Sequence, residues 1–282
     1  MGIDQLSLLR GRPIKINNYL TIKQPTIGEI EEAGEARFFN TFWTLCSCAW
    51  DMPSFFDDLG IDFMSISDWS FFMQISKGFS QDDTKLIFGD LDFSKFETRI
   101  LITDENEEER IPVLANIEPI VINDIEYNVE EYLFTEQMYQ DSINIIREMI
   151  GFSHQGRKAK NKATAKVLIL DDRKRKSRNK DKAYESIFFN GIISLVNTEE
   201  FSYTYETAFE LTMYQFTKSL LQISGKKQAC ALLQGSMSGF VDTKGIPSKN
   251  FQWQYSEDKY KRTSGKTLKG SLSPNGGSLN VK

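Results

Sequence analysis

The clearest hydrophobic pattern in the chain lies between residues 201 and 223. Apolar side chains recur there every three or four residues, at Tyr205, Phe209, Met213, Phe216, Leu220 and Ile223. This spacing keeps them on one face of an α-helix, so the sequence predicts a single amphipathic helix, capped at its start by Ser202 or Thr204. Helices of this kind gain most of their stability from packing. We therefore expect the stripe to be buried in the core or against a partner.

Shorter patterns predict the elements that begin the chain. The first 25 residues contain the apolar runs LSLLR, PIKI and YLTI, which we interpret as short strands with a turn at Asn17-Asn18. Thr26 and Glu29 then have the spacing of a helix N-cap and its capping box. Helical patterns continue from there, with breaks, to Gly78.

Two hairpins and further helices are predicted after this region. The acidic run at 104–109 separates one pair of apolar runs, and Asn123-Asp124 separates another, which is typical of hairpin turns. A long helix is expected from about Val129 to Ile150, with Gly151 ending it, and shorter helical patterns follow at 184–196 and 226–238. The sequence therefore predicts an α+β fold that is mainly helical, with small antiparallel β-hairpins.

Composition supports a packed core, and charge is distributed unevenly. Hydrophobic residues make up 40% of the 282 positions, which is enough for a globular fold. Residues 157–182 contain twelve Lys or Arg and three Asp, a net +9, whereas the net charge of the whole chain is −5. This basic segment has little to bury, so we expect a solvated helix face or a partly ordered connection.

These patterns divide the chain into four parts. We expect an N-terminal α+β part at 1–153, a basic connecting segment at 154–183 and a helical C-terminal part at 184–261. The last part, at 262–282, is rich in Ser, Gly and Lys and is expected to be a flexible tail.

No motif for catalysis, for a metal or for a cofactor is evident. Three cysteines, Cys46, Cys48 and Cys230, are an odd number, which points to a reducing compartment, and Cys46 and Cys48 are expected to be buried, reduced thiols without metal. His154 is the only histidine and so cannot form a multi-histidine zinc site. The run at Ser264–Thr267 lacks the first glycine of a phosphate-binding loop. We expect no enzyme activity and no cofactor, and we expect neither a signal peptide nor a membrane-spanning segment.

The basic segment allows two interpretations. Its cations, above all Arg173, Lys174, Arg175 and Lys176, can neutralise nucleic-acid phosphates in a salt-dependent way. However, the segment has no aromatic side chain on which bases could stack, and the acidic remainder of the chain would repel a polyanion. Nucleic-acid binding is therefore expected to be weak and salt-sensitive. Contact with an acidic protein surface, including that of a neighbouring copy, is the other interpretation.

Three stretches together carry a family resemblance. They are LSLLRGRPIKINNYLTIKQPTIGEI near the start, YNVEEY at Tyr127–Tyr132, and YTYETAFELTMYQFTKSLLQI with the later GFVDTKGIP. In pattern and order, over most of residues 6–250, they resemble proteins of the tail-morphogenesis modules of phages and prophages of Gram-positive bacteria. Tail assembly chaperones and minor virion components are proteins of this kind.

The resemblance implies a phage virion-morphogenesis protein that acts through protein–protein contacts. Its expected partners are other phage structural or tail proteins and other copies of the chain, in the host cytoplasm or the virion. No site residue follows from the resemblance, so the partner-binding candidates come from the patterns above: Tyr205, Phe209, Met213, Phe216, Leu220, Arg173, Lys174, Arg175 and Lys176. A nucleic-acid-associated protein that uses residues 157–182 is the alternative.

Overall fold

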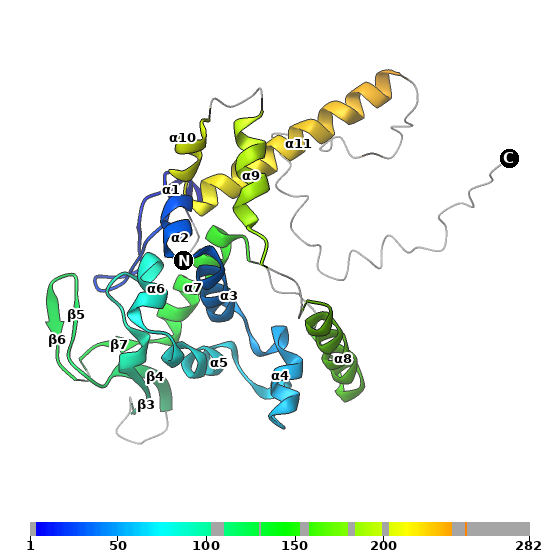
Figure 1. The fold of residues 1–282 in the computed structure, drawn as a ribbon. Helices are drawn as coiled ribbons and strands as arrows, with labels where there is room; N and C mark the ends of the chain where they lie inside the picture. Colours follow the sequence, from blue (N-terminus) through cyan, green and yellow to red (C-terminus); the bar gives the residue numbers. More distant parts are fainter. Residues whose placement is uncertain are drawn as a thin grey trace. The chain divides into compact units, whose positions relative to one another are not determined.

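The computed structural model describes residues 4–102, 110–129, 131–152, 158–179, 184–198, 203–238 and 246. The chain divides into two compact units, Met1–Thr217 and Lys218–Lys282. The described residues are mainly helical with small antiparallel sheets, which confirms the predicted fold class (Figure 1). None of their helices is long and apolar enough to cross a bilayer. The predicted tail, His154 and Ser264–Thr267 lie outside the described residues, and the four predicted parts stay predictions.

The helices begin and end where capping side chains and glycines allow. Thr26 and Glu29 form the predicted capping box at the start of the second helix, and Gly151 ends the long helix in a left-handed conformation with φ 68°, also as predicted. The α-helices of the described residues are α1 (Gln5–Leu9), α2 (Ile27–Ala33), α3 (Glu35–Cys46), α4 (Pro53–Asp58), α5 (Asp68–Ile75), α6 (Gln81–Phe88), α7 (Glu136–Ile150), α8 (Lys162–Asn179), α9 (Ile187–Val196), α10 (Tyr205–Phe209) and α11 (Met213–Met237). Short 3₁₀ helices lie between some of them: η1 (Ala49–Asp51), η2 (Phe63–Ser65), η3 (Ser76–Gly78) and η4 (Phe93–Lys95).

The strands form three small antiparallel sheets within the described residues. They are β1 (Ile14–Lys15) with β2 (Thr21–Ile22), β3 (Phe96–Ile102) with β4 (Arg110–Asn116) and β7 (Leu133–Phe134), and β5 (Ile120–Ile122) with β6 (Ile125–Tyr127). Asn17 makes the first turn, since its Oδ1 accepts from Tyr19 N at 2.9 Å and Leu20 N at 2.8 Å. Asn123 and Asp124 have φ of 52° and 62° in the turn between β5 and β6. These pairings confirm the predicted hairpins; the acidic run at 104–109 lies outside the described residues.

Two predictions for local structure are wrong. The run LSLLR is part of helix α1 rather than a strand, because Asp4 caps it by accepting from Leu6 N at 3.0 Å. The long helix begins at Glu136 rather than near Val129. The residues just before it instead form β7, which pairs with β4.

The predicted single helix over 201–223 is also wrong, because the chain breaks between α10 and α11. Thr212 forms an isolated antiparallel bridge with Thr26 at this break. Its backbone N donates to Gln215 Oε1 at 2.9 Å and its Oγ1 accepts from Gln215 N at 3.3 Å, so the two residues cap the start of α11. The helix predicted at 226–238 is not separate, since α11 continues to Met237.

Aromatic side chains fill the core of the first unit. The Phe72 ring lies 4.7 Å from the Tyr139 ring and 5.8 Å from the Phe134 ring, measured between centroids. A second hydrophobic cluster contains Ala165 and Ile169 of α8 together with residues of α4, α5, η1 and η2. The described part of the basic segment therefore contains helix α8, and one face of this helix is packed, which the charge pattern did not predict.

Candidate functional site

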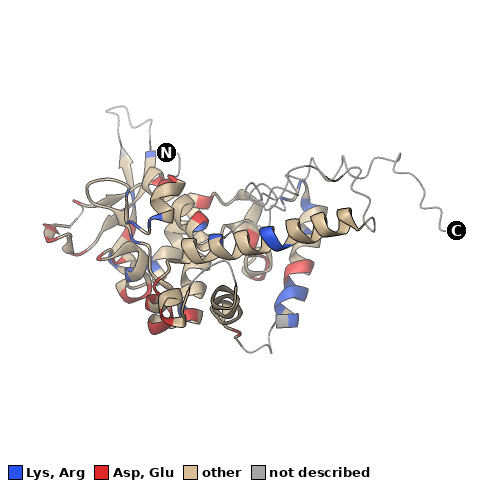
Figure 2. Ribbon diagram, turned by 90° about the horizontal axis from the view of Figure 1, so that it is seen from above, with Lys and Arg blue, Asp and Glu red and all other residues tan. Residues whose placement is uncertain are grey.

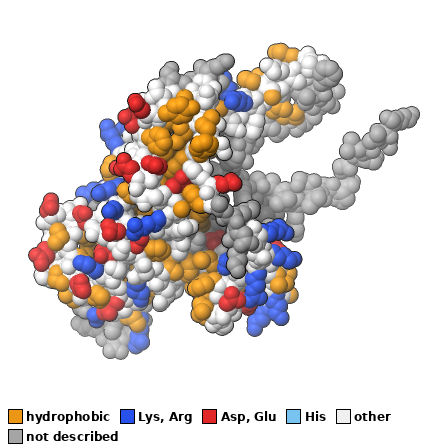
Figure 3. All heavy atoms as spheres, viewed as in Figure 1, with side chains coloured by type: hydrophobic (Ala, Val, Ile, Leu, Met, Phe, Trp, Pro, Cys, Tyr) orange, Lys and Arg blue, Asp and Glu red, His pale blue; other side chains and the backbone are white. Residues whose placement is uncertain are grey.

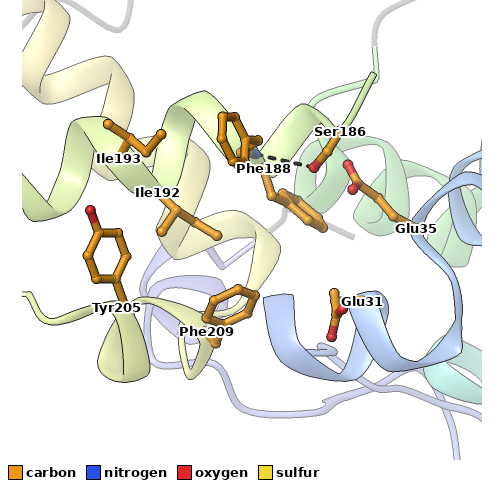
Figure 4. Close-up of a pocket in the computed structure, with 9 residues that line it drawn as sticks. Glu31, Glu35, Ser186, Phe188, Ile192, Ile193, Tyr205 and Phe209 are labelled. Atoms are coloured by element: carbon orange, nitrogen blue, oxygen red, sulfur yellow. Dashed lines mark hydrogen bonds between the residues drawn. The ribbon is translucent and has the colours of Figure 1, made fainter. Parts of the chain in front are cut away.

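A pocket of about 320 Å³ opens between α9, α10 and the ends of α2 and α3. Helix α9 supplies isoleucines and phenylalanines to one side of the pocket, and Ile192 points toward Tyr205 and Phe209 of α10 on the opposite side (Figure 4). The residues that line the pocket are Glu31, Glu35, Ser186, Phe188, Phe189, Ile192, Ile193, Tyr205 and Phe209. Six of these nine side chains are aromatic or aliphatic, so the walls are mostly apolar.

Hydrogen bonds fix the helix that forms the first wall. Ser186 caps α9, because its Oγ accepts from Phe189 N at 3.2 Å. A carboxylate oxygen of Glu35 accepts from Ile187 N at 2.6 Å and thereby joins the start of α9 to the start of α3. At the opposite wall, Thr204 and Thr207 form a capping box at the start of α10. The pocket is thus built on helix ends with satisfied backbone groups.

Two adjacent phenylalanines on α9 have opposite environments. Phe188 is 2% exposed, and its ring lies 5.7 Å from the Phe39 ring and 5.5 Å from the Phe216 ring. Phe189, which also lines the pocket, is 65% exposed. The aromatic ring of Tyr205 is also largely exposed. Figure 3 shows a hydrophobic area over α9 and α10, and a surface of this kind marks an interaction site.

Carboxylates give the edge of the pocket a negative charge. Glu31 and Glu35 line it, and no Lys or Arg is found among the described lining residues. Glu206 and Glu210 are further exposed carboxylates on α10 and at its end. Acidic side chains accordingly lie beside the hydrophobic area in Figure 3. The pocket therefore favours an apolar group that carries positive charge beside it.

A glycine lets two different helices supply the two carboxylates. Gly34 lies between α2 and α3 with φ 94°, a backbone conformation that residues other than glycine rarely adopt. The sharp change of direction at Gly34 places Glu31 at the end of α2 and Glu35 at the start of α3, both facing the pocket.

The chemistry of these side chains suits binding. The Ser186 hydroxyl caps α9, and the polar side chains among the described lining residues are that hydroxyl and the carboxylates of Glu31 and Glu35. Within the described ranges, no group of three or more His, Cys, Asp or Glu is arranged to hold a metal ion. The arrangement can bury an apolar side chain and attract cations at its edge.

The predicted stripe is divided between this pocket and the core. Tyr205 and Phe209 line the pocket, where Phe209 is half-buried. Met213 and Phe216 are buried in the first unit, as expected of the stripe, and Leu220 is half-buried in the second unit. Tyr205 is 54% exposed, so its burial against a partner stays a prediction.

The basic candidates lie on α8, where the blue segments in Figure 2 are prominent, and most of them contact the chain itself. Arg173 Nη2 lies 2.8 Å from a carboxylate oxygen of Asp57 and 2.5 Å from one of Asp58. Arg175 Nη2 lies 2.6 Å from a carboxylate oxygen of Asp172. Lys174, by contrast, is exposed.

A buried carboxylate joins α8 to α4. Asp172 is 5% exposed and accepts hydrogen bonds from Ser54 N at 3.2 Å and Ser54 Oγ at 2.6 Å. Lys176 Nζ lies 3.3 Å from the Asp172 carboxylate and donates to Ser54 Oγ at 2.7 Å. Neutralising residues 173–176 would therefore weaken the packing of α8, which the sequence alone presents as a segment with little to bury.

Sequence reasoning missed the α9 wall of the pocket. A short amphipathic helix was predicted at 184–196, but seven of the ten residues of the observed helix, Ile187–Val196, are Ile, Phe, Leu or Val, which leaves apolar side chains on more than one face. That excess was an available signal. Glu31 and Glu35 gave no local signal, because only the fold brings them beside α9.

Comparison with curated proteins and with solved structures gave no match. A comparison with family models did give one. Residues 178–255 match the family model of the YomV second domain, and this segment contains α9, α10 and the apolar walls of the pocket.

Proposed function

We propose that this chain is a phage virion-morphogenesis protein that acts through protein–protein contacts at the α9–α10 pocket. In this role it is a tail assembly chaperone or a minor structural component of the particle. The observation that carries the proposal is the exposed apolar surface around the pocket, with Phe189 at 65% exposure.

The family match supports the phage context. The segment that resembles the YomV second domain includes both apolar walls of the pocket, and YomV is a Bacillus prophage-region protein. The resemblance in pattern and order to tail-morphogenesis proteins points the same way and supplies the finer role.

The test is a pair of matched substitutions made in the phage that encodes the chain. Phe189→Glu places a charge at the mouth of the pocket and should lower the yield of assembled tails, counted by electron microscopy, at least tenfold. Phe55→Glu is the control, because Phe55 is also exposed, at 46%, but lies on α4. Mass spectrometry of purified particles then separates the two roles, since a structural component is retained and a chaperone is not.

Two results would contradict the proposal. Tail yield that is unchanged by Phe189→Glu would show that the pocket has no part in assembly. Normal tails after deletion of the whole gene would show that the chain itself has none.

The nucleic-acid alternative has less support. Arg173, Arg175 and Lys176 are engaged by carboxylates of their own chain, which leaves fewer cations for phosphates. Helix α8 also carries no aromatic side chain for stacking on bases.

A further inference from the structure

We infer that the pocket of one copy binds the exposed face of α8 of a second copy, so that the chain self-associates head to tail. This inference rests on the proposed function, because it names a protein that binds the same pocket, a second copy of the chain. It is carried by a match between two surfaces of the molecule in both hydrophobicity and charge.

Helix α8 has an apolar pair that its own chain does not cover. Ala165 and Ile169 are buried against the α4 region, whereas Val167 is 55% exposed and Leu170 is 54% exposed. At 3.6 residues per turn, Val167 lies about 200° around the helix from Ile169. The exposed pair is therefore on a different side of α8 from its intrachain contact.

Lysines flank this pair at intervals of about one helical turn. Lys166 and Lys174 are both exposed, one before and one after the pair, and Lys174 shares the stripe of Val167 and Leu170 by spacing. The α8 face thus presents two apolar side chains with Lys166 before them and Lys174 after them, and one exposed carboxylate, Asp171, next to Leu170. The pocket presents the opposite arrangement, with apolar walls beside Glu31 and Glu35.

The intrachain contacts of α8 are compatible with this docking. Arg173, Asp172 and Lys176 hold α8 on α4, and none of them belongs to the exposed apolar pair. The described residues that line the pocket include none from α8 of the same chain. A second copy can therefore supply the helix while each copy keeps its own α8–α4 packing.

The symmetry of the assembly follows from the use of two different surfaces. A head-to-tail contact between unlike patches is heterologous, and an open complex of this kind leaves one free pocket at one end and one free helix at the other. Such complexes grow into closed rings or open filaments, whereas an isologous contact stops at the dimer. Because the contact includes surface charges, it should weaken as salt is raised.

The experiment is sedimentation velocity of the full chain with two blocking variants. Phe189→Glu blocks the pocket and Leu170→Glu blocks the helix, and both positions are exposed, so circular dichroism should show unchanged folding. Wild-type protein should form complexes larger than dimers as its concentration rises. Each variant alone should associate at least tenfold more weakly, and Phe55→Glu should associate like the wild type.

An equimolar mixture of the two variants gives the decisive measurement. One variant retains a working helix and the other a working pocket, so the mixture should form a 1:1 complex that does not grow further. In a second check, Glu31→Lys and Lys174→Glu should each weaken association, and the two changes combined in one chain should restore part of it.

Three outcomes would overturn this inference. Wild-type protein could remain monomeric at all concentrations, the variant mixture could fail to form the 1:1 complex, or association could stop at the wild-type dimer. If tail assembly nevertheless depends on Phe189, a basic amphipathic helix of another protein occupies the pocket and the proposed function stands. Head-to-tail complexes in a chain that tail assembly does not need would instead contradict the proposed function alone.

Discussion

The neighbouring phenylalanines of α9 give the sharpest prediction for stability. Phe188→Ala removes a ring that is 2% exposed and contacts two other rings. Core Phe→Ala substitutions cost about 3–5 kcal/mol. Because Phe188 also borders the pocket, the space it leaves can partly fill with solvent, and we expect a cost near the lower end, about 3 kcal/mol. Phe189→Ala should change the free energy of unfolding by less than about 0.5 kcal/mol, since its ring is largely exposed.

Urea unfolding, monitored by tryptophan fluorescence, measures the difference in the free energy of unfolding between the two variants. A cost of about 3 kcal/mol corresponds to a fall of roughly 6–12 °C in Tm for a unit of this size. A double-mutant cycle with Phe216→Ala should show a coupling of about 0.5–1.5 kcal/mol, because the Phe188 and Phe216 rings are in edge-to-face contact. Equal costs for Phe188→Ala and Phe189→Ala, or no coupling to Phe216, would refute the assignment of one ring to the core and the other to the surface.

Three further predictions concern charges and thiols. Burial alone would raise the pKa of Asp172, but hydrogen bonds from Ser54 and Arg175 outweigh it and hold the pKa below the ordinary value of 3.8. The stability that Asp172 contributes is therefore fully present above pH 3.8 and is lost as the pH falls through the lowered pKa. Asp172→Asn should unfold more easily than the wild type at pH 7, by about 1–3 kcal/mol. On acidification the variant should lose less stability than the wild type does. Burial raises the pKa of Cys46 and Cys48 to about 12. A thiol reagent should therefore react rapidly with the exposed Cys230 and with Cys46 and Cys48 only after unfolding. Elemental analysis of the native protein should find no zinc. Duplex and single-stranded nucleic acid should bind weakly and dissociate by about 200 mM salt, and sub-micromolar binding at physiological salt would favour the nucleic-acid alternative.

Local rules predicted most of the elements. Thr26 with Glu29, the turn at Asn123-Asp124 and the end at Gly151 each act within a few residues, so their outcome was visible in the sequence. The break before α11 was also locally encoded, in the capping pair Thr212 and Gln215. A continuous apolar stripe obscured that signal, because the spacing of the stripe is the same whether one helix or two carry it.

Contacts across long sequence separations could not be predicted. The packing of α8 depends on Asp172 meeting Ser54, 118 residues earlier, and the charge of the segment suggested only a solvated surface. Of the residues that line the pocket, Tyr205 and Phe209 belong to the apolar stripe that the sequence shows between residues 201 and 223. The phenylalanines of α9 became distinguishable only when the fold buried one of them and left the other exposed.

The two chemical components of the pocket come from separate stretches of the chain. Its apolar walls lie within the segment that matches the YomV second domain, whereas Glu31 and Glu35 lie about 150 residues earlier and outside that match. The apolar contacts and the charge preference of the pocket can therefore change independently in evolution. Substitutions in α2 and α3 can alter which charge a ligand must carry, while the apolar walls stay the same. A protein that shares only the matched segment would have the apolar walls without these two carboxylates, so other residues would have to set the charge preference of its pocket.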